Sequence, residues 1–193
     1  DEDGLVDGES ADRLARLRSG ATAAVEIAWA GNGVLNLWVT RTSEIEAIEN
    51  GVKLIVIVTE NIPRQEVAQM VELANLRGAR IIGPNCLGLI TPGECKMGGP
   101  IGIMSRSGGM TTEIASTLTA AGLGQSTAVS IGGDAIIGTS YAELMPYFEA
   151  DPETKAIAIY SEPGGRMEAE LAEWETEHRS RLPIVAFMAG RLM

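Results

Sequence analysis

Strand-like and helix-like segments alternate along the chain from residue 43 to residue 188, and few folds accommodate this order. The apolar run 53-KLIVIVT-59 has no polar alternation, which is typical of a parallel strand that helices cover on both faces. We therefore predict an α/β fold with a doubly wound parallel sheet. The predicted strands are 53–59, 79–83, 101–104, 126–130, 155–160 and 183–188, and the predicted helices are 44–50, 64–78, 107–121, 139–150 and 167–180.

The first 43 residues carry weaker signals. We expect a short helix at 10–18 and strands at 21–31 and 34–39. The stretch 83–100 is rich in glycine and proline, so it is the best candidate for a junction between two domains.

Composition excludes several classes of protein. The 193 residues carry a formal net charge of −11, so the surface repels nucleic acid and anionic membranes. Aromatic residues make up only 4% of the chain, too few for a surface on which bases stack. The longest uninterrupted aliphatic run, 54-LIVIV-58, is far too short to span a bilayer. We expect neither a nucleic-acid partner nor a membrane partner.

Cysteine and histidine are scarce. Cys86 and Cys95 are too few for a disulfide scaffold, so we expect a reducing compartment: the cytoplasm, or the mitochondrial matrix in a eukaryote. Because the sequence has no C-x-x-C motif and only one histidine, His178, we do not expect a structural zinc site.

Ligands of open α/β sheets bind at the carboxyl ends of the strands. This rule selects five loops as candidates for a binding site. They are 59–63, 83–88, 105–109, 131–138 and 161–165, and all but the first contain glycine.

The loop 105-SRSGG-109 leaves a strand and begins a helix. The first N–H groups of a helix lack intrahelical acceptors and lie at the positive end of the helix dipole. Gly108 and Gly109 have no side chain to block an anion, and the hydroxyls of Ser105 and Ser107 add donors. These residues could hold a phosphate, a phosphoryl group or a carboxylate. By local pattern alone, a plain N-cap at Ser107 with glycines that only form a turn is an equally good interpretation.

Five segments, in chain order, carry a family resemblance: 47-AIENGVKLIVIVTENIP-63, 82-IGPNCLGLITPGECKMG-98, 105-SRSGGMT-111, 122-GLGQSTAVSIGGD-134 and 151-DPETKAI-157. They resemble the α subunit of succinyl-CoA synthetase and its acyl-CoA ligase relatives, which include ATP-citrate lyase and citryl-CoA synthetase. The resemblance implies a partial Rossmann-like, CoA-binding region at residues 1–83 and a flavodoxin-like ligase domain at residues 84–193.

The family's reaction implies roles for several residues. A nucleoside triphosphate phosphorylates a histidine, the phosphoryl group passes to a carboxylic acid, and coenzyme A displaces it to form a thioester. The resemblance implies that Ser105, Ser107, Gly108 and Gly109 receive the phosphohistidine. It also implies that Glu162, in an E-x-G-G turn, braces the histidine ring, since a carboxylate there would fix the tautomer. The implied partner is a nucleotide-binding β subunit of the ATP-grasp type, or a fused equivalent, which holds ATP or GTP with Mg²⁺.

The resemblance also implies where coenzyme A is contacted. Thr59, Glu60 and Asn61 match the family's T-E-G-I-P loop, with asparagine in place of glycine. Cys86 corresponds to a cysteine close to the family's active site, but as a lone thiol we expect it to be a packed residue without a catalytic role.

The chain departs from the family pattern in three places. The family's catalytic histidine stands in a G-H-A-G motif, which residues 1–193 do not contain, and His178, late in a predicted helix, is not expected to replace it. The glycine-rich CoA loop of the family is not visible in residues 1–50, and the connection before 101–104 is short. We therefore expect the chain to be an incomplete part of a longer one.

The choice of carboxylic acid depends on two positions. Succinate-type members read SRSGTLTYE, with a tyrosine at the acid pocket, whereas this chain reads SRSGGMTTE with Gly109 and Thr112. The form SRSGGM resembles the citrate-handling relatives, and a small Thr112 leaves room for a bulkier acid. We predict a succinate–CoA ligase-like enzyme component; the alternatives are a citryl-CoA synthetase or ATP-citrate lyase component, or a non-catalytic CoA-binding regulatory module.

Overall fold

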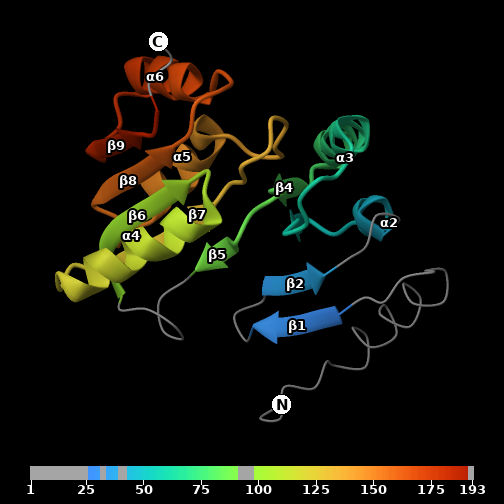
Figure 1. The fold of residues 1–193 in the computed structure, drawn as a ribbon, viewed down its shortest axis with the longest axis horizontal. Coiled ribbons are helices and arrows are strands. Elements are labelled where there is room, and N and C mark those ends of the chain that lie inside the picture. Colours follow the sequence, from blue (N-terminus) through green and yellow to red (C-terminus); the bar gives the residue numbers. More distant parts are fainter. Residues whose placement is uncertain (1–25, 31–33, 39–42, 91–97, 191–193) are drawn as a thin grey trace.

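The computed structural model of the protein describes residues 26–30, 34–38, 43–90 and 98–190, which form three sheets (Figure 1). The helix predicted at 10–18 lies outside these residues. In chain order the elements are β1 (Glu26–Ala30), β2 (Val34–Trp38), α2 (Ser43–Glu49), β3 (Leu54–Val56), α3 (Arg64–Arg77), β4 (Arg80–Ile82), β5 (Gly88–Ile90), β6 (Gly98–Ser105), α4 (Gly108–Ala120), β7 (Gln125–Ser130), α5 (Tyr141–Ala150), β8 (Ala156–Ser161), α6 (Met167–His178) and β9 (Ile184–Met188).

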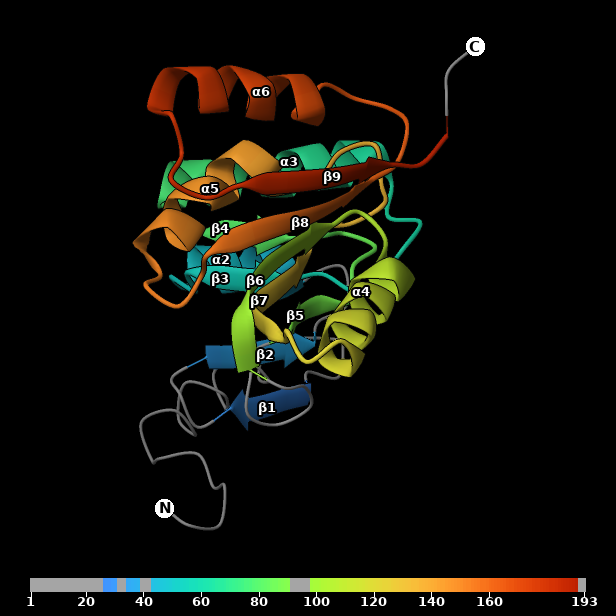
Figure 2. The same ribbon diagram turned by 90° about the vertical axis from the view of Figure 1, so that its left-hand side faces the viewer.

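The main sheet has the strand order β5-β7-β6-β8-β9, and its last four strands run parallel. Helix α4 covers one face, and α5 and α6 cover the other (Figure 2). Ile103 of β6 packs with Ala115 of α4, whereas the next residue, Met104, packs with Tyr141 of α5. Neighbouring residues of a strand face opposite sides, so the apolar β6 segment fills both cores. The predicted doubly wound α/β fold is confirmed.

The edge strand β5 is absent from the sequence prediction. It runs antiparallel to β7, with Gly88 opposite Ser130 and Ile90 opposite Ala128. The segment is short and lies within the glycine- and proline-rich stretch 83–100, whose composition favours a loop. Its strand conformation depends on pairing with β7, which local sequence does not reveal.

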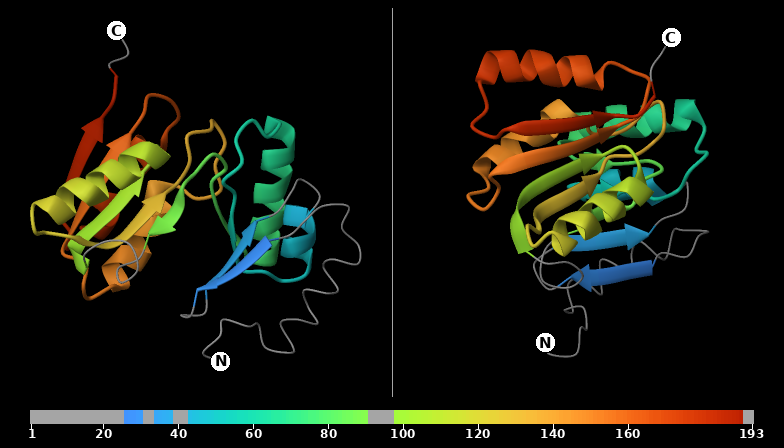
Figure 3. Two further views of the ribbon diagram at one scale, coloured as in Figure 1. Left: turned by 60° about the horizontal axis from the view of Figure 1, so that its bottom comes forward. Right: turned by 60° about the vertical axis from the view of Figure 1, so that its left-hand side comes forward.

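A second, smaller core lies between the parallel pair β3–β4 and the helices α2 and α3. Ile55, Val67 and Ile81 are buried in this core. The next residue, Ile82, instead joins the core of the main sheet, so β4 lies between the two cores. In the left-hand view of Figure 3 these elements group on one side and the main sheet with its helices on the other. The domain boundary expected after residue 83 falls directly after β4.

Glycine and serine mark three helix ends. Gly51 (φ 87°) and Gly78 (φ 62°) follow α2 and α3 in the left-handed conformation that favours glycine. Ser140 begins α5 with a capping box, because its Oγ accepts from the Glu143 N–H while the Glu143 carboxylate accepts from the Ser140 N–H.

The N-terminal strands β1 and β2 pair antiparallel, with Ile27 opposite Leu37. The parallel part of the N-terminal region is therefore the β3–β4 pair, with Ile55 opposite Ile81. None of the described helices is both long enough and apolar enough to cross a membrane.

Candidate functional site

The carboxyl ends of β6, β7 and β8 meet at one edge of the main sheet. The last residue of β6, Ser105, lies opposite Ser130 of β7 and Tyr160 of β8. The loops that follow these strands therefore leave the sheet side by side, where open α/β sheets bind their ligands. We call residues 105–109 the serine–glycine turn and residues 162–165 the glutamate turn.

Two serines shape the serine–glycine turn. Ser105 is fully buried, and its hydroxyl donates to the Ser107 carbonyl (2.8 Å) and accepts from the Ser107 N–H (3.1 Å). Ser107 is the N-cap of α4, and its Oγ accepts from the Met110 N–H at 3.4 Å. The serine hydroxyls thus hold the turn in shape, while the N–H groups of Gly108 and Gly109 begin the helix without intrahelical acceptors.

The two glycines differ in their surroundings. A Cβ at Gly108 would lie 3.3 Å from the Cβ of Leu87, so the 83–88 loop packs against the start of α4. The atom nearest to a Cβ at Gly109 would be the Ser107 Oγ, at 4.0 Å, and Gly109 is exposed. The open side of the turn is therefore at Gly109, where an anion could approach the positive end of the helix dipole.

Glu162 is half-buried in the glutamate turn, which lies against the serine–glycine turn. Arg106 joins the two: its N–H donates to the Tyr160 carbonyl (3.1 Å), and its Nη1 donates to the Gly164 carbonyl (2.9 Å). Behind Glu162, the Ser161 hydroxyl donates to the carboxylate of Glu168 on α6. The fold therefore brings together the two turns that carry the predicted phosphate-binding and bracing residues.

Thr59, Glu60 and Asn61 are exposed in the loop that follows β3. Asn61 has φ 61°, the left-handed conformation in which glycine is most common and asparagine is tolerated. The replacement of the family's glycine by Asn61 therefore keeps a residue suited to this backbone. The Thr59 carbonyl accepts from the Asn85 N–H at 2.9 Å, which connects the loop to the rest of the site.

Thr112 is the fifth residue of α4 and lies one turn along the helix from Gly108. It is half-buried, and its Oγ1 donates to the Gly108 carbonyl at 3.3 Å. This hydrogen bond turns the hydroxyl back onto the helix, so the side chain adds little bulk beside the open face of the serine–glycine turn.

Neither Cys86 nor His178 belongs to the two turns of the site: Cys86 is a packed residue, and His178 ends helix α6. Cys86 is buried, its Sγ donates to the Ile57 carbonyl (3.2 Å), and burial raises the pKa of its thiol to about 11. The thiol is therefore protonated at neutral pH and packed as expected. His178 is exposed at the last residue of α6, where its ring stacks on Trp174 with centroids 4.5 Å apart. Cys95 lies outside the described residues.

Two residues of the site are missing from the sequence prediction: Arg106 and Asn85. Asn85 has φ 55°, its carbonyl accepts from the Gly133 N–H (3.1 Å), and its Nδ2 donates to Asp134 (3.0 Å). Asparagine after proline in G-P-N is a turn signal that could have identified Asn85. No comparable signal exists for Arg106, because an arginine after a strand is usually a solvent-exposed residue.

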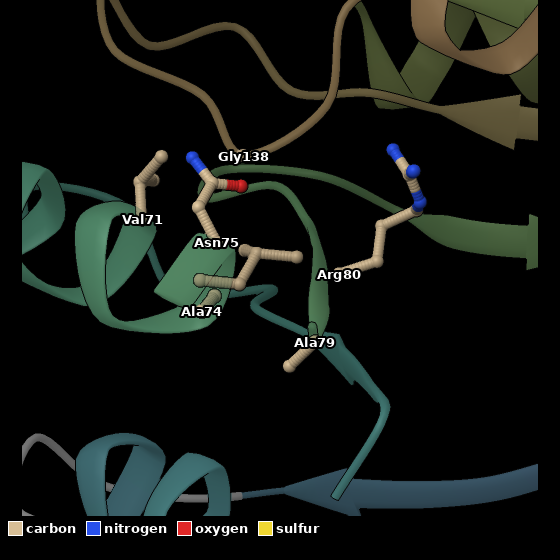
Figure 4. A pocket seen from close by; sticks show the side chains of 7 residues that line it. Val71, Ala74, Asn75, Ala79, Arg80 and Gly138 are labelled. Carbon is tan, nitrogen blue, oxygen red and sulfur yellow. The ribbon is translucent and has the colours of Figure 1, made fainter. Parts of the chain in front are cut away.

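The pocket in Figure 4 is lined by none of the predicted site residues. Its volume is about 30 Å³, and it lies between α3, β4 and the loop at Gly138. Its lining residues are Val71, Ala74, Asn75, Ala79, Arg80, Ile81 and Gly138. Within the described ranges, no group of three or more His, Cys, Asp or Glu side chains could hold a metal ion.

Comparisons with known proteins agree with this arrangement. The family model of the succinyl-CoA ligase-like flavodoxin domain matches residues 98–193. Subunit alpha 2 of an ADP-forming succinate–CoA ligase from Archaeoglobus fulgidus is 45% identical over 155 residues, which cover 76% of this chain and 53% of that protein. A subunit of an ADP-forming sulfoacetate–CoA ligase from Bilophila wadsworthia is 38% identical over 164 residues, which cover 79% of this chain and 56% of that protein.

Solved structures show the same fold. The ATP citrate lyase of Methanosaeta concilii, in complex with (3S)-citryl-CoA, matches with a TM-score of 0.70 at 21% identity, over 87% of this chain and 34% of that one. This chain spans about half the length of the curated relatives it matches. The matched segments and the fold agree, and the chain belongs to the family of succinyl-CoA synthetase α subunits and their acyl-CoA ligase relatives.

Proposed function

We propose that this chain is the part of an acid–CoA ligase that binds coenzyme A and receives the phosphohistidine. The observation that carries the proposal is the contact between the glutamate turn and the serine–glycine turn. The Arg106 Nη1 and the Gly164 carbonyl, 2.9 Å apart, hold these turns together at the carboxyl edge of the sheet. The turn that carries the bracing carboxylate, Glu162, and an anion-binding helix start thus lie together at the carboxyl edge of the main sheet.

In the proposed reaction, a phosphohistidine enters this edge from a segment that residues 1–193 do not contain. The N–H groups of Gly108 and Gly109 donate to the phosphoryl oxygens, and the dipole of α4 stabilises their negative charge. Glu162 accepts a hydrogen bond from the histidine ring and fixes its tautomer, so that the other ring nitrogen carries the phosphoryl group. Ser105 and Ser107 keep the turn in the shape that exposes these donors.

The proposal places coenzyme A at the exposed loop of Thr59, Glu60 and Asn61. Its backbone connection through Asn85 brings this loop to the same edge of the sheet as the serine–glycine turn. Coenzyme A supplies the thiol that takes up the acyl group. The nucleotide, ATP or GTP with Mg²⁺, is held by a separate β subunit of the ATP-grasp type or a fused equivalent.

The acid is succinate or a relative of it. The similar proteins act on succinate and on sulfoacetate, as their names state. One observation favours the second candidate, a citrate-type acid: the face beside Gly109 is open, and Thr112 folds its hydroxyl back onto the Gly108 carbonyl. A larger acid would fit there without displacing a side chain.

Thioester formation by the full-length protein with its nucleotide-binding partner tests the proposal. We expect acyl-CoA with ATP or GTP and one of succinate, sulfoacetate, malate or citrate, together with an acid-labile phosphoenzyme. A complex that binds coenzyme A but forms neither product would instead be a regulatory CoA-binding module. Replacement of Glu162 by Gln serves as the site variant, and we expect it to lower kcat about 10- to 100-fold.

The choice of acid can be tested in the same assay. The double variant Gly109→Thr and Thr112→Tyr restores the residues of succinate-type members and fills the open face. We expect kcat/KM to shift toward succinate and away from citrate by about tenfold or more, since added side chains exclude the larger acid. Equal changes for all four acids would contradict a role of these positions in acid selection.

A further inference from the structure

Arg106 is buried beneath the candidate site. The residue comes directly after β6, between Ser105 and Ser107 in the sequence, and it is 5% exposed. The guanidinium donates to four backbone carbonyls: Nε to Gly132 (3.4 Å), Nη1 to Gly164 (2.9 Å), and Nη2 to Gly133 (3.1 Å) and Asp134 (2.7 Å). These carbonyls belong to the loops that follow β7 and β8. The Arg106 side chain therefore binds the loops on both sides of the serine–glycine turn.

The charge of Arg106 is not neutralised by a carboxylate in the part of the chain that the structure describes, where the ion pairs involve Arg80 and Arg181. A buried guanidinium that is solvated only by carbonyl groups is costly compared with an apolar side chain of similar volume. Stability alone therefore gives little reason for an arginine here. The geometry it imposes on the surrounding loops gives a better one.

We propose that Arg106 is a positioning residue for phosphoryl transfer at the serine–glycine turn. It fixes the serine–glycine turn against the loops that follow β7 and β8. The N–H groups of Gly108 and Gly109 thereby keep the orientation that binds a phosphoryl group, and Glu162 stays at the correct distance from the histidine. The inference rests on the proposed function. It assigns no contact between the guanidinium and the phosphoryl group, because four N–H donors already bind carbonyls.

The same side chain reaches the proposed CoA loop indirectly. Arg106 binds the carbonyls of Gly133 and Asp134, Asn85 binds the same two residues, and the Asn85 N–H donates to the Thr59 carbonyl. Arg106 thus lies where three loops of the site meet. A planar fork with five N–H donors can serve carbonyls in several directions, whereas lysine offers a point charge on a flexible stem.

Arg181 provides a matched control. Its guanidinium also donates to four backbone carbonyls, those of Phe148 (3.3 Å), Thr154 (3.0 Å), Glu149 (2.8 Å) and Asp151 (2.9 Å). Among the described residues it also forms, unlike Arg106, an ion pair with a carboxylate, that of Glu149, at 3.2 Å. It lies just before β9 and therefore at the amino edge of the parallel strands, opposite the candidate site. Replacing either arginine by lysine keeps the charge and removes the planar fork, but only one replacement touches the site.

The test compares Arg106→Lys with Arg181→Lys in the full-length protein and its partner complex, at a temperature where both are folded. We expect Arg106→Lys to lower kcat for acyl-CoA formation about 10- to 100-fold, and Arg181→Lys to change it less than about twofold. Equal losses of kcat in the two variants, or no loss in either, would overturn the proposal.

Hydrogen exchange gives a readout that does not need turnover. Inorganic phosphate is expected to slow amide exchange in the peptide spanning 105–112 in the wild type and in Arg181→Lys, but not in Arg106→Lys. Unchanged phosphate protection in Arg106→Lys overturns the positioning role. The two proposals can fail separately. If the wild type forms no thioester while phosphate still slows amide exchange only when Arg106 is present, the proposed ligase function is refuted. The role of Arg106 in shaping the anion-binding turn is then still supported.

A second variant covers the case in which Arg106→Lys does not fold. Gly164→Ala acts on the acceptor of the same hydrogen bond, and a Cβ there would meet no atom within 4 Å. Because Gly164 has φ 122°, a conformation that residues with a side chain rarely adopt, the turn must shift and move its carbonyl away from Arg106. We expect the same fall in kcat and loss of phosphate protection; wild-type behaviour of Gly164→Ala would overturn the proposal.

Discussion

Glu44, in the first turn of α2, is a carboxylate in an unfavourable place. The residue is 3% exposed, and its Oε2 has no hydrogen-bond partner in the described part of the chain. Burial, with a smaller contribution from the nearby Glu66 carboxylate, raises the pKa of Glu44 above its ordinary value of 4.5. The folded state therefore favours the protonated form, and this contribution to stability is lost as pH rises through the folded pKa.

We expect Glu44→Gln to raise the free energy of unfolding at pH 8 by on the order of 1 kcal/mol, because it removes a charge that has to be buried. The gain should vanish below pH 4.5, where the carboxyl group is protonated in both states. Urea unfolding across this pH range measures the effect. Glu49→Gln, on the exposed side of the same helix, serves as the control, and a less stable Glu44→Gln protein at pH 8 would contradict the argument.

At the scale of elements, strand β6 and helix α5 pack closely because Gly102 has no side chain. A Cβ at Gly102 would lie 2.7 Å from the Ile157 Cδ1 and 2.7 Å from ring carbons of Phe148. We expect Gly102→Ala to lower the free energy of unfolding by about 1–3 kcal/mol, since the strand and the helix must move apart. Urea denaturation followed by circular dichroism gives the value.

The contrasting variant is Gly109→Ala, at the open start of α4. The nearest atom to the new Cβ would be 4.0 Å away, so the packing is not disturbed. Alanine also loses less conformational freedom than glycine when a helix forms, so we expect unchanged stability or a gain of up to about 1 kcal/mol. If Gly109→Ala lowered the free energy of unfolding as much as Gly102→Ala, the loss of a glycine, and not a packing clash, would explain both effects.

At the scale of the whole molecule, β9 leaves an apolar edge on the main sheet. Val185, Phe187 and Met188 are 72%, 65% and 53% exposed, and β8 is the neighbour of β9 among the described strands. An apolar edge strand is a template for pairing with another chain. We expect this chain, expressed alone, to self-associate with rising concentration.

Val185→Lys should reduce this association, because a charged side chain on an edge strand opposes edge-to-edge pairing. Light scattering over a range of concentrations measures it. Thr176→Lys on the exposed side of α6 adds the same charge without removing apolar surface. If both variants reduce association equally, net charge and not the β9 edge is responsible.

From residue 43 onward the sequence predicted the order of strands and helices, because continuous β-branched runs and amphipathic segments determine these elements locally. Strand lengths were predicted less well: the run 53–59 is a strand only at Leu54–Val56. Gly51 and Gly78, which have positive φ, stand where α2 and α3 end, and a glycine after an apolar-periodic segment is a local signal of a helix end. The antiparallel strand β5 depends on pairing with β7, and the inward course of the Arg106 side chain depends on carbonyls from two distant loops. Neither can be read from neighbouring residues.

The connection between Ile90 and Gly98 starts and ends away from the candidate site, because β5 runs antiparallel to β7. Because β5 runs against β7, the 83–88 loop arrives at the carboxyl edge, and the chain then travels away from it to Ile90. The connection that follows ends at Gly98, opposite Gln125 at the amino end of β7. A relative could therefore lengthen or shorten this connection between Ile90 and Gly98 with both of its anchors directed away from the serine–glycine turn.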